Sequence, residues 1–136
     1  MFEHIHLDHV VLRARDAEAL AAFYCAVLGA RIERRLDIGL IQVRAGDILI
    51  DIVAATSTLG RRGGPPPGPG HNLVHFCLRV DPFDEAALRV HLADCGAQAS
   101  ETDEVYGAEG FGPSIYVTDP EGNVMELKGP PVRGRV

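Results

Sequence analysis

The sequence lacks the features that mark membrane, secreted and nucleic-acid-binding proteins. No stretch approaches the roughly 18 consecutive apolar residues of a membrane-spanning helix, and the opening MFEHIHLDH lacks the basic and apolar regions of a signal peptide. Lysine and arginine occur only in short pairs, and the formal net charge is −6, so there is no basic stripe for phosphates. We therefore expect a cytoplasmic protein that binds neither membranes nor nucleic acid.

Cysteine and aromatic residues are scarce. The three cysteines are odd in number, lack C-x-x-C spacing and lie in apolar stretches, which favours reduced, structural thiols. Tryptophan is absent, and the aromatic residues are three tyrosines and five phenylalanines. The length of 136 residues, with 46% hydrophobic and 24% charged residues, suits one globular domain.

The sequence does contain a repeated seven-residue motif. LDHVVLR at residues 7–13 and LVHFCLR at residues 73–79 share Leu, His, Leu and Arg at matching offsets. Each copy of the motif has the alternating pattern of a strand, and each is followed by a helical pattern and then by further strands. Duplication of a strand, helix and three-strand unit explains this order better than chance similarity.

The pattern predicts the following elements. Helices are expected over 17–28, capped by Asp16 and Gly29, and from Asp81 and Pro82 to Gly96. Extended runs are expected at 30–36, 38–45, 47–55, 97–102, 113–119 and 123–128. We predict an α+β fold: a single domain over 1–136, in which two βαβββ modules, 5–55 and 72–130, form a cupped mixed sheet with the helices on its convex side. A Pro- and Gly-rich linker covers 56–71.

Each copy of the repeat places a histidine on the strand face that points away from the helix. Alternate side chains of a strand share a face. Val10 and Leu12 are therefore expected under the helix and His9 on the opposite side, and the same parity holds for His75. A lone strand histidine is more commonly a hydrogen-bonded core or rim residue, but the duplicated position favours a site.

The last strand of each copy adds a carboxylate, Asp51 or Glu126, at the same parity. A carboxylate in apolar surroundings is costly unless it is paired or metal-bound. If each module curls into a half-barrel, the two histidines and two carboxylates would converge as ligands for Zn, Ni, Co, Fe or Mn. Alternatively, the carboxylates pair with Arg13 or Arg79.

Three stretches resemble the vicinal oxygen chelate superfamily, which includes glyoxalase I, extradiol dioxygenases and the fosfomycin and bleomycin resistance proteins. They are LDHVVLRARDAEALAAFYCAVLGA, NLVHFCLRV and SIYVTDPEGNVMELKG. The resemblance implies paired βαβββ modules around a divalent metal, with His9, Asp51, His75 and Glu126 as ligands. It also implies a homodimer in which modules of both chains build each site.

The ligand set is most similar to that of glyoxalase I, an isomerase acting on the hemithioacetal of methylglyoxal and glutathione. The resemblance implies that a metal holds two vicinal oxygens of a small-molecule substrate and stabilises an enediolate, with Glu126 as the base. Arg13 matches a position that holds a glutathione carboxylate, or is a solvated strand-end residue. Two departures are Asp51, where glutamate is usual, and Ala55, where an asparagine contacts glutathione.

Two other functions remain open at this stage. If Asp51 does not reach the metal, His9, His75 and Glu126 form a 2-His-1-carboxylate set suited to Fe(II) and an extradiol-type dioxygenase. A non-catalytic, resistance-type dimer could instead bind a small molecule. The Gly-rich stretch 105–114 could close as a lid, and three aromatic residues around it are candidate substrate contacts: Tyr106, Phe111 and Tyr116.

Overall fold

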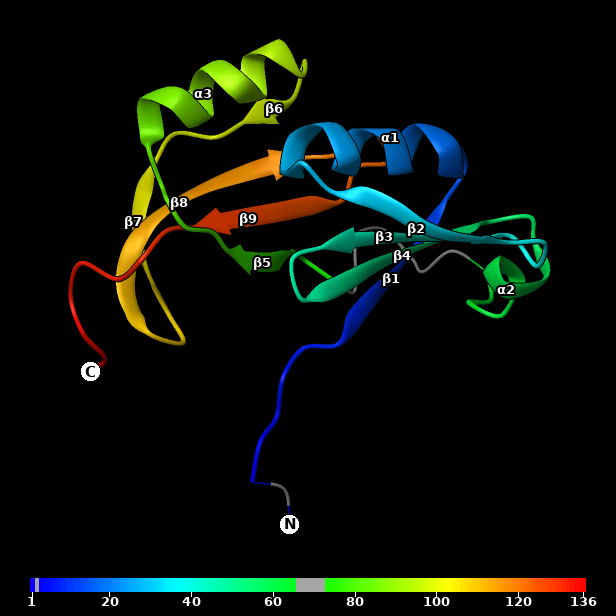
Figure 1. The fold of residues 1–136 in the computed structure, drawn as a ribbon, viewed down its shortest axis with the longest axis horizontal. Helices are drawn as coiled ribbons and strands as arrows, with labels where there is room; N and C mark the ends of the chain where they lie inside the picture. The colour runs from blue at the N-terminus through cyan, green and yellow to red at the C-terminus, as the bar shows by residue number, and fades with distance from the viewer. Residues whose placement is uncertain (2, 66–72) are drawn as a thin grey trace. The chain divides into compact units, whose positions relative to one another are not determined.

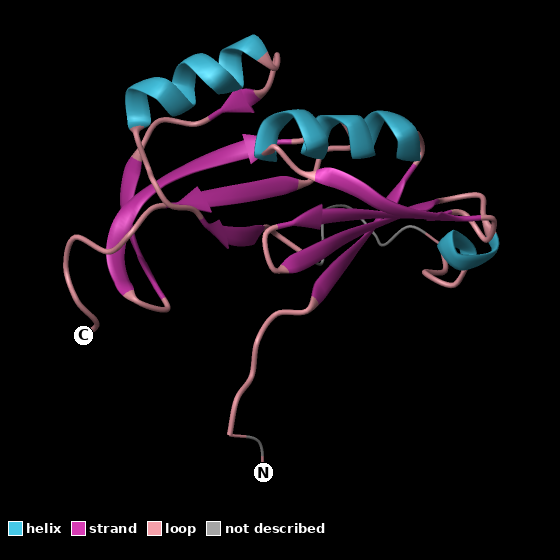
Figure 2. Cartoon of the chain, viewed as in Figure 1, coloured by secondary structure: helices cyan, strands magenta, loops and turns pink. Residues whose placement is uncertain are grey.

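The structure is a computed structural model that describes residues 1, 3–65 and 73–136. Contacts divide the chain into two compact units, residues 1–68 (unit 1) and 69–136 (unit 2). Within its described residues, each unit contains one mixed β-sheet and one helix of ten or more residues. Figures 1 and 2 show how these elements follow one another along the chain. The predicted α+β class, with two modules of strand, helix and further strands, is confirmed.

Unit 1 follows the predicted order closely. Its elements are β1 (His9–Ala14), α1 (Ala17–Leu28), β2 (Arg31–Leu36), β3 (Leu40–Ala45), β4 (Ile48–Ala54) and the short α2 (Thr58–Arg61). The sheet order is β1-β4-β3-β2, with β1 parallel to β4 and the other pairs antiparallel. The linker was predicted to lack packed structure, but Thr58–Arg61 forms a helical turn because the Ser57 hydroxyl accepts from the Gly60 amide at 3.0 Å.

Helix α1 begins and ends where the sequence predicts. The Asp16 carboxylate accepts from the Ala19 amide at 3.0 Å, and Gly29 takes the left-handed conformation with φ of 62°. The buried face of α1 lies against β3 and β4, where Ile50 and Ile52 are fully buried. The unit therefore has a core on the helix side of its sheet.

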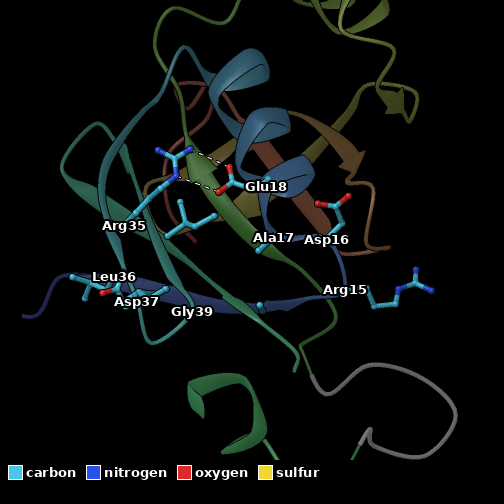
Figure 3. Close-up of a pocket in the computed structure, with 11 residues that line it drawn as sticks. Arg15, Asp16, Ala17, Glu18, Arg35, Leu36, Asp37 and Gly39 are labelled. Atoms are coloured by element: carbon cyan, nitrogen blue, oxygen red, sulfur yellow. Dashed lines mark hydrogen bonds and ion pairs between the residues drawn. The ribbon is translucent and has the colours of Figure 1, made fainter. Parts of the chain in front are cut away.

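An ion pair fastens α1 to strand β2. Arg35 donates from Nε and Nη2 to the two carboxylate oxygens of Glu18, at 3.2 and 3.0 Å. The pair borders a cavity of about 540 Å³ at the start of α1, and Figure 3 shows the two side chains facing each other. The Arg35 hydrogen bond holds the pKa of Glu18 below its usual value.

Unit 2 repeats the plan with one addition. Its elements are β5 (Phe76–Arg79), α3 (Glu85–Asp94), β6 (Gln98–Ala99), β7 (Asp103–Gly107), β8 (Gly110–Thr118) and β9 (Val124–Lys128). The sheet order is β5-β9-β8-β6, with β5 parallel to β9, and β7 pairs with the first part of β8. Its core includes Ile115, Val117, Met125 and Leu127.

Two predictions for unit 2 are wrong. Helix α3 begins at Glu85 rather than at Pro82, because Asp84 and not Asp81 caps it, accepting from the Ala87 amide at 3.1 Å. Residues 105–114 do not form a loop that could act as a lid. They belong to the β7–β8 hairpin, drawn yellow to orange in Figure 1, which is fixed by register pairs from Asp103 with Ser114 to Gly107 with Gly110.

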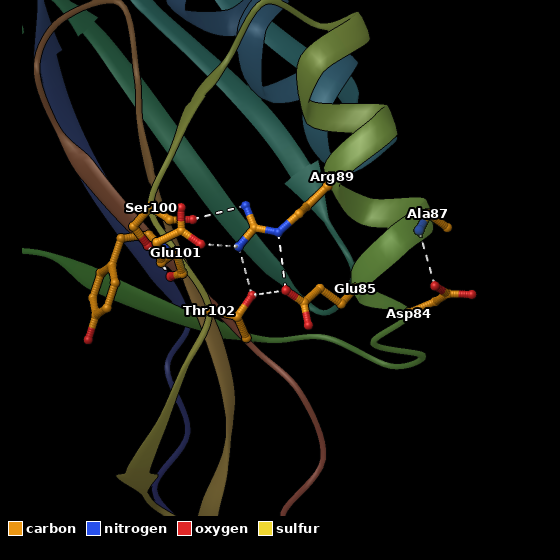
Figure 4. Close-up of polar contacts among 8 residues, drawn as sticks. Asp84, Glu85, Ala87, Arg89, Ser100, Glu101 and Thr102 are labelled. Atoms are coloured by element: carbon orange, nitrogen blue, oxygen red, sulfur yellow. Dashed lines mark hydrogen bonds and ion pairs between the residues drawn. The ribbon is translucent and has the colours of Figure 1, made fainter.

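A polar network fastens α3 to the segment that precedes β7. Arg89 donates to the Glu85 carboxylate at 3.1 Å, to the Ser100 carbonyl at 3.1 Å and to the Thr102 hydroxyl at 2.8 Å (Figure 4). The Ser100 hydroxyl in turn accepts from the Tyr116 amide of β8 at 3.0 Å. Among the described residues, no helix is both long and apolar enough to cross a membrane.

Candidate functional site

In unit 2 the predicted histidine and carboxylate lie on one face of the sheet. Strand register sets Glu126 opposite Cys77 on one side and opposite Tyr116 on the other. We call this face, which points away from the core residues of β8 and β9, the site face. Its members are His75, Cys77, Arg79, Ser114, Tyr116, Glu126 and Lys128.

Glu126 is the centre of the site face. Its residue surface is 5% exposed, and its two oxygens have different partners. The Ser114 hydroxyl donates to Oε1 at 2.6 Å, and His75 Nε2 lies 3.2 Å from Oε2. The His75 ring also meets the Tyr116 ring edge to face, with centroids 5.3 Å apart. Glu126 is therefore a buried carboxylate held from two sides, with a half-exposed imidazole against one oxygen.

The Cys77 thiol and the Tyr116 phenol, which lie beside Glu126, stay protonated near neutral pH. Burial, followed by the charge of Glu126, raises the pKa of the Cys77 thiol to about 12. Burial and the same carboxylate also raise the pKa of the Tyr116 phenol. Cys77 is therefore no thiolate nucleophile in this environment, and Tyr116 keeps its hydroxyl proton as a hydrogen-bond donor.

Unit 1 uses the same register but different partners. Val11 pairs with Asp51, and His9 lies two residues before Val11. In the same way, Cys77 pairs with Glu126, and His75 lies two residues before Cys77. Asp51 is buried, and both of its oxygens accept from Gln42 Nε2, at 3.1 and 3.2 Å. His9 Nδ1 instead lies 2.6 Å from the neighbouring Asp8 carboxylate. That hydrogen bond raises the pKa of His9, and the charge of Asp51 raises it further.

Neither arginine of the repeated motif, Arg13 or Arg79, forms an ion pair with Asp51 or Glu126. Arg13 donates from Nη1 to the carbonyl oxygens of Gly64 at 2.6 Å and Gly60 at 3.3 Å, which fastens the segment after α2 to β1. Arg79 donates to the Glu109 carboxylate at 2.6 Å. The alternative that Asp51 and Glu126 are simply neutralised by these arginines is wrong.

The three predicted aromatic contacts separate into two groups. Tyr116 lies on the site face beside His75. Tyr106 and Phe111 are register partners near the end of the β7–β8 hairpin, with ring centroids 5.0 Å apart. Alternation along β8 sets Phe111 on the side of Ile115, opposite to the site face. The structure therefore brings Tyr116 to the candidate site and does not bring Tyr106 or Phe111 there.

The family model for the Glyoxalase/Bleomycin resistance protein/Dioxygenase superfamily matches residues 6–127 of this sequence. The chain belongs to this superfamily. Solved structures with the same fold include an integron cassette protein from V. cholerae, with 24% identity over 95% of this chain and 98% of that chain and a TM-score of 0.75. A lactoylglutathione lyase from Agrobacterium tumefaciens has 20% identity over 94% and 96%, with a TM-score of 0.68. A fosfomycin resistance protein from Mesorhizobium loti has 17% identity over 97% and 96%, with a TM-score of 0.64.

The donor chemistry of this superfamily member fits a divalent ion. Imidazole nitrogen and carboxylate oxygen are ligands of Zn, Ni, Co, Fe and Mn, and His75 with Glu126 brings one of each to contact distance. Unit 1 offers the same two donor types in His9 and Asp51. Within residues 1, 3–65 and 73–136, no group of three or more His, Cys, Asp or Glu side chains gathers for an ion.

Three polar residues that the sequence analysis did not single out belong with these carboxylates. Gln42 binds Asp51, Ser114 binds Glu126, and Lys128 lies two residues beyond Glu126 on the site face. By side-chain alternation, each lies on the same strand face as a predicted ligand. A search of the sequence for every polar residue on that face would therefore have found them.

Proposed function

We propose that this protein is a metal-dependent enzyme of the glyoxalase type, an isomerase or lyase for a small substrate with two vicinal oxygens. The observation that supports it best is the contact of 3.2 Å between His75 and Glu126, on a face where Ser114 and Tyr116 supply further polar groups. In the proposed homodimer, His9 and Asp51 contribute the remaining ligands. A bound divalent ion would supply positive charge for an anion developing on the substrate oxygens.

The residues of the site face have separate roles in this proposal. Glu126 is the base that moves a proton between adjacent substrate carbons, because its carboxylate is buried and only Oε1 is engaged by a hydroxyl donor. Ser114 fixes the orientation of that carboxylate. Tyr116 holds the His75 ring and, since its phenol stays protonated, can donate to a substrate oxygen. Arg13 keeps a proposed role as a substrate contact through the guanidinium nitrogens that carry no carbonyl bond.

The test is metal binding followed by activity. Metal-free protein is titrated with Ni, Co and Zn by calorimetry, and each loaded form is assayed on the hemithioacetal of methylglyoxal and glutathione. His75→Ala should abolish high-affinity binding. A His4→Ala, His6→Ala double variant is the matched control, because these exposed histidines near the N-terminus could bind metal adventitiously and should not change the result. Equal metal binding by His75→Ala and wild type would contradict the proposal.

One observation favours a second function. Because Gln42 occupies both oxygens of Asp51, His9, His75 and Glu126 would remain as a 2-His-1-carboxylate set, the arrangement of Fe(II) oxygenases. Oxygen uptake by the Fe(II)-loaded protein with a catechol, and no isomerase activity with any metal, would establish this alternative. If the protein retains no divalent ion in excess metal, both enzyme functions fail and small-molecule binding by a dimer remains.

A further inference from the structure

Lys128 is a buried cation without a counter-charge. Only 7% of its surface is exposed, and it forms no ion pair in the part of the chain that the structure describes. Its Nζ donates to the backbone carbonyl oxygens of Val105 and, at 3.1 Å, Gly112. Lysine is rarely buried unless it is paired, because the ammonium group loses its hydration. The charge at this position therefore needs an explanation.

The fold itself does not require a cation here. Lys128 follows Glu126 by two residues on β9, and the corresponding residue in unit 1, two after Asp51 on β4, is Val53. Val53 is buried to the same degree, with 6% exposed. The same position of the repeated sheet is thus filled by hydrocarbon in one unit and by an ammonium group in the other.

The glycine at position 107 makes room for the lysine side chain. A Cβ on Gly107 would lie 2.6 Å from Lys128 Cε and 3.1 Å from Cδ. Gly107 has no positive φ, so space for the lysine side chain, rather than backbone conformation, accounts for this glycine. An ammonium has three donors, and the two carbonyl bonds leave one N–H without an acceptor among the described residues.

The position of Lys128 relates this cation to the proposed reaction. Lys128 and Glu126 share the site face, and two residues of strand separate their Cα atoms by about 6.7 Å. Ser114, the register partner of Lys128 on β8, already donates its hydroxyl to Glu126. Besides Glu126, whose partners are Ser114 and His75, the acids on this side are Asp103, opposite Ser114 on β7, and Glu109, which pairs with Arg79. Lys128 is therefore the cation of the site face that no acid neutralises.

We propose that Lys128 binds an oxyanionic group, a carboxylate or a phosphate, on the substrate whose vicinal oxygens meet His75 and Glu126. This inference rests on the proposed function and narrows it to anionic substrates. Because Lys128 and Glu126 share the site face, the anionic group and the reacting oxygens would meet the same face of the sheet. Lys128 acts as a specificity residue through its charge and its third N–H.

The test uses metal-free protein in the presence of a chelator, so that phosphate cannot bind through a metal. Inorganic phosphate and acetate are titrated separately by NMR and calorimetry, which identifies the preferred oxyanion. Wild type should bind at least one of them, and Lys128→Met, which keeps the aliphatic stem, should weaken binding at least tenfold. Lys128→Val, which copies the unit 1 residue, should do the same. Arg133→Gln removes an exposed cation of unit 2 and should leave binding unchanged.

Chemical-shift mapping on wild type keeps the test decisive if either Lys128 variant does not fold. Added oxyanion should shift the amide resonances of Lys128 and of Tyr106, whose N–H belongs to the same peptide group as the Val105 carbonyl that holds Lys128. Absence of those shifts, or wild-type affinity in Lys128→Met, would overturn the inference. If metal binds but neither oxyanion does, only the role of Lys128 is lost. If an oxyanion binds but metal does not, the proposed function fails while the anion site stands.

Discussion

The two units place a histidine and a carboxylate at the same register yet connect them differently. In unit 2, His75 lies 3.2 Å from Glu126, whereas in unit 1 His9 contacts Asp8 and Gln42 holds Asp51. Glutamate is one methylene longer than aspartate, so Glu126 can reach the imidazole that starts two residues earlier on the neighbouring strand. The difference shows that a duplicated backbone fixes positions, while side-chain length and local competitors decide which contacts form.

The largest expected effect separates the two carboxylates. Glu126→Gln should weaken divalent-metal binding by more than about 100-fold, beyond the loss caused by removing an outer partner of a ligand. Asp51→Asn should weaken it by only about tenfold, because Gln42 engages both Asp51 oxygens and competes with the ion for them. Calorimetric titration with Zn or Ni measures both. Equal losses would show that Asp51 is a ligand equivalent to Glu126.

The next largest effect is a loss of stability when the hydrogen-bond donors to Asp51 and Glu126 are removed. Gln42→Leu should lower the free energy of unfolding by about 2–3 kcal/mol, because both oxygens of a buried carboxylate lose their donor. Ser114→Ala should cost less, about 1–2 kcal/mol, because Oε2 of Glu126 keeps His75. Urea unfolding measures both. Asp51→Asn in the Gln42→Leu background should recover part of the loss, and additive effects would argue against the assigned bond.

The helix caps should behave alike in the two units. Asp16→Ala and Asp84→Ala should each lower the free energy of unfolding by about 1 kcal/mol, since each removes an acceptor for an amide of the first turn. Asp81→Ala, the cap that the sequence predicted, is the control and should change stability by less than about 0.5 kcal/mol. A larger loss for Asp81→Ala than for Asp84→Ala would contradict the observed start of α3.

The smallest effect concerns the titration of His9. The Asp8 carboxylate stabilises the imidazolium form and raises the pKa of His9, with a smaller contribution from the charge of Asp51. Asp8→Asn should therefore lower the pKa of His9, and neutral imidazole would persist to lower pH. Asp51→Asn should lower it less. NMR titration of the ring protons decides the order, and a larger shift in Asp51→Asn would mean that His9 faces Asp51 rather than Asp8.

The sequence was a good guide where a signal is local. The cap at Asp16, the end of α1 at Gly29 and the alternation that separates Glu126 from Met125 and Leu127 depend on neighbours along the chain. It failed for β7, where DEVYG shows no apolar alternation and the strand forms only because β8 supplies its partner. It also failed at α3, where Asp81 before Pro82 and Asp84 are both plausible caps.

The sequence by itself determined the duplicated α+β modules and the strand parity of His9, Asp51, His75 and Glu126, because side-chain alternation is a property of the extended chain alone. Only the tertiary structure decided which partner each carboxylate takes. Gln42 reaches Asp51 from 9 residues away, and Ser114 reaches Glu126 from 12. Such contacts exist only once neighbouring strands pair in a set register, and the same pairing buries Lys128 among carbonyls rather than acids.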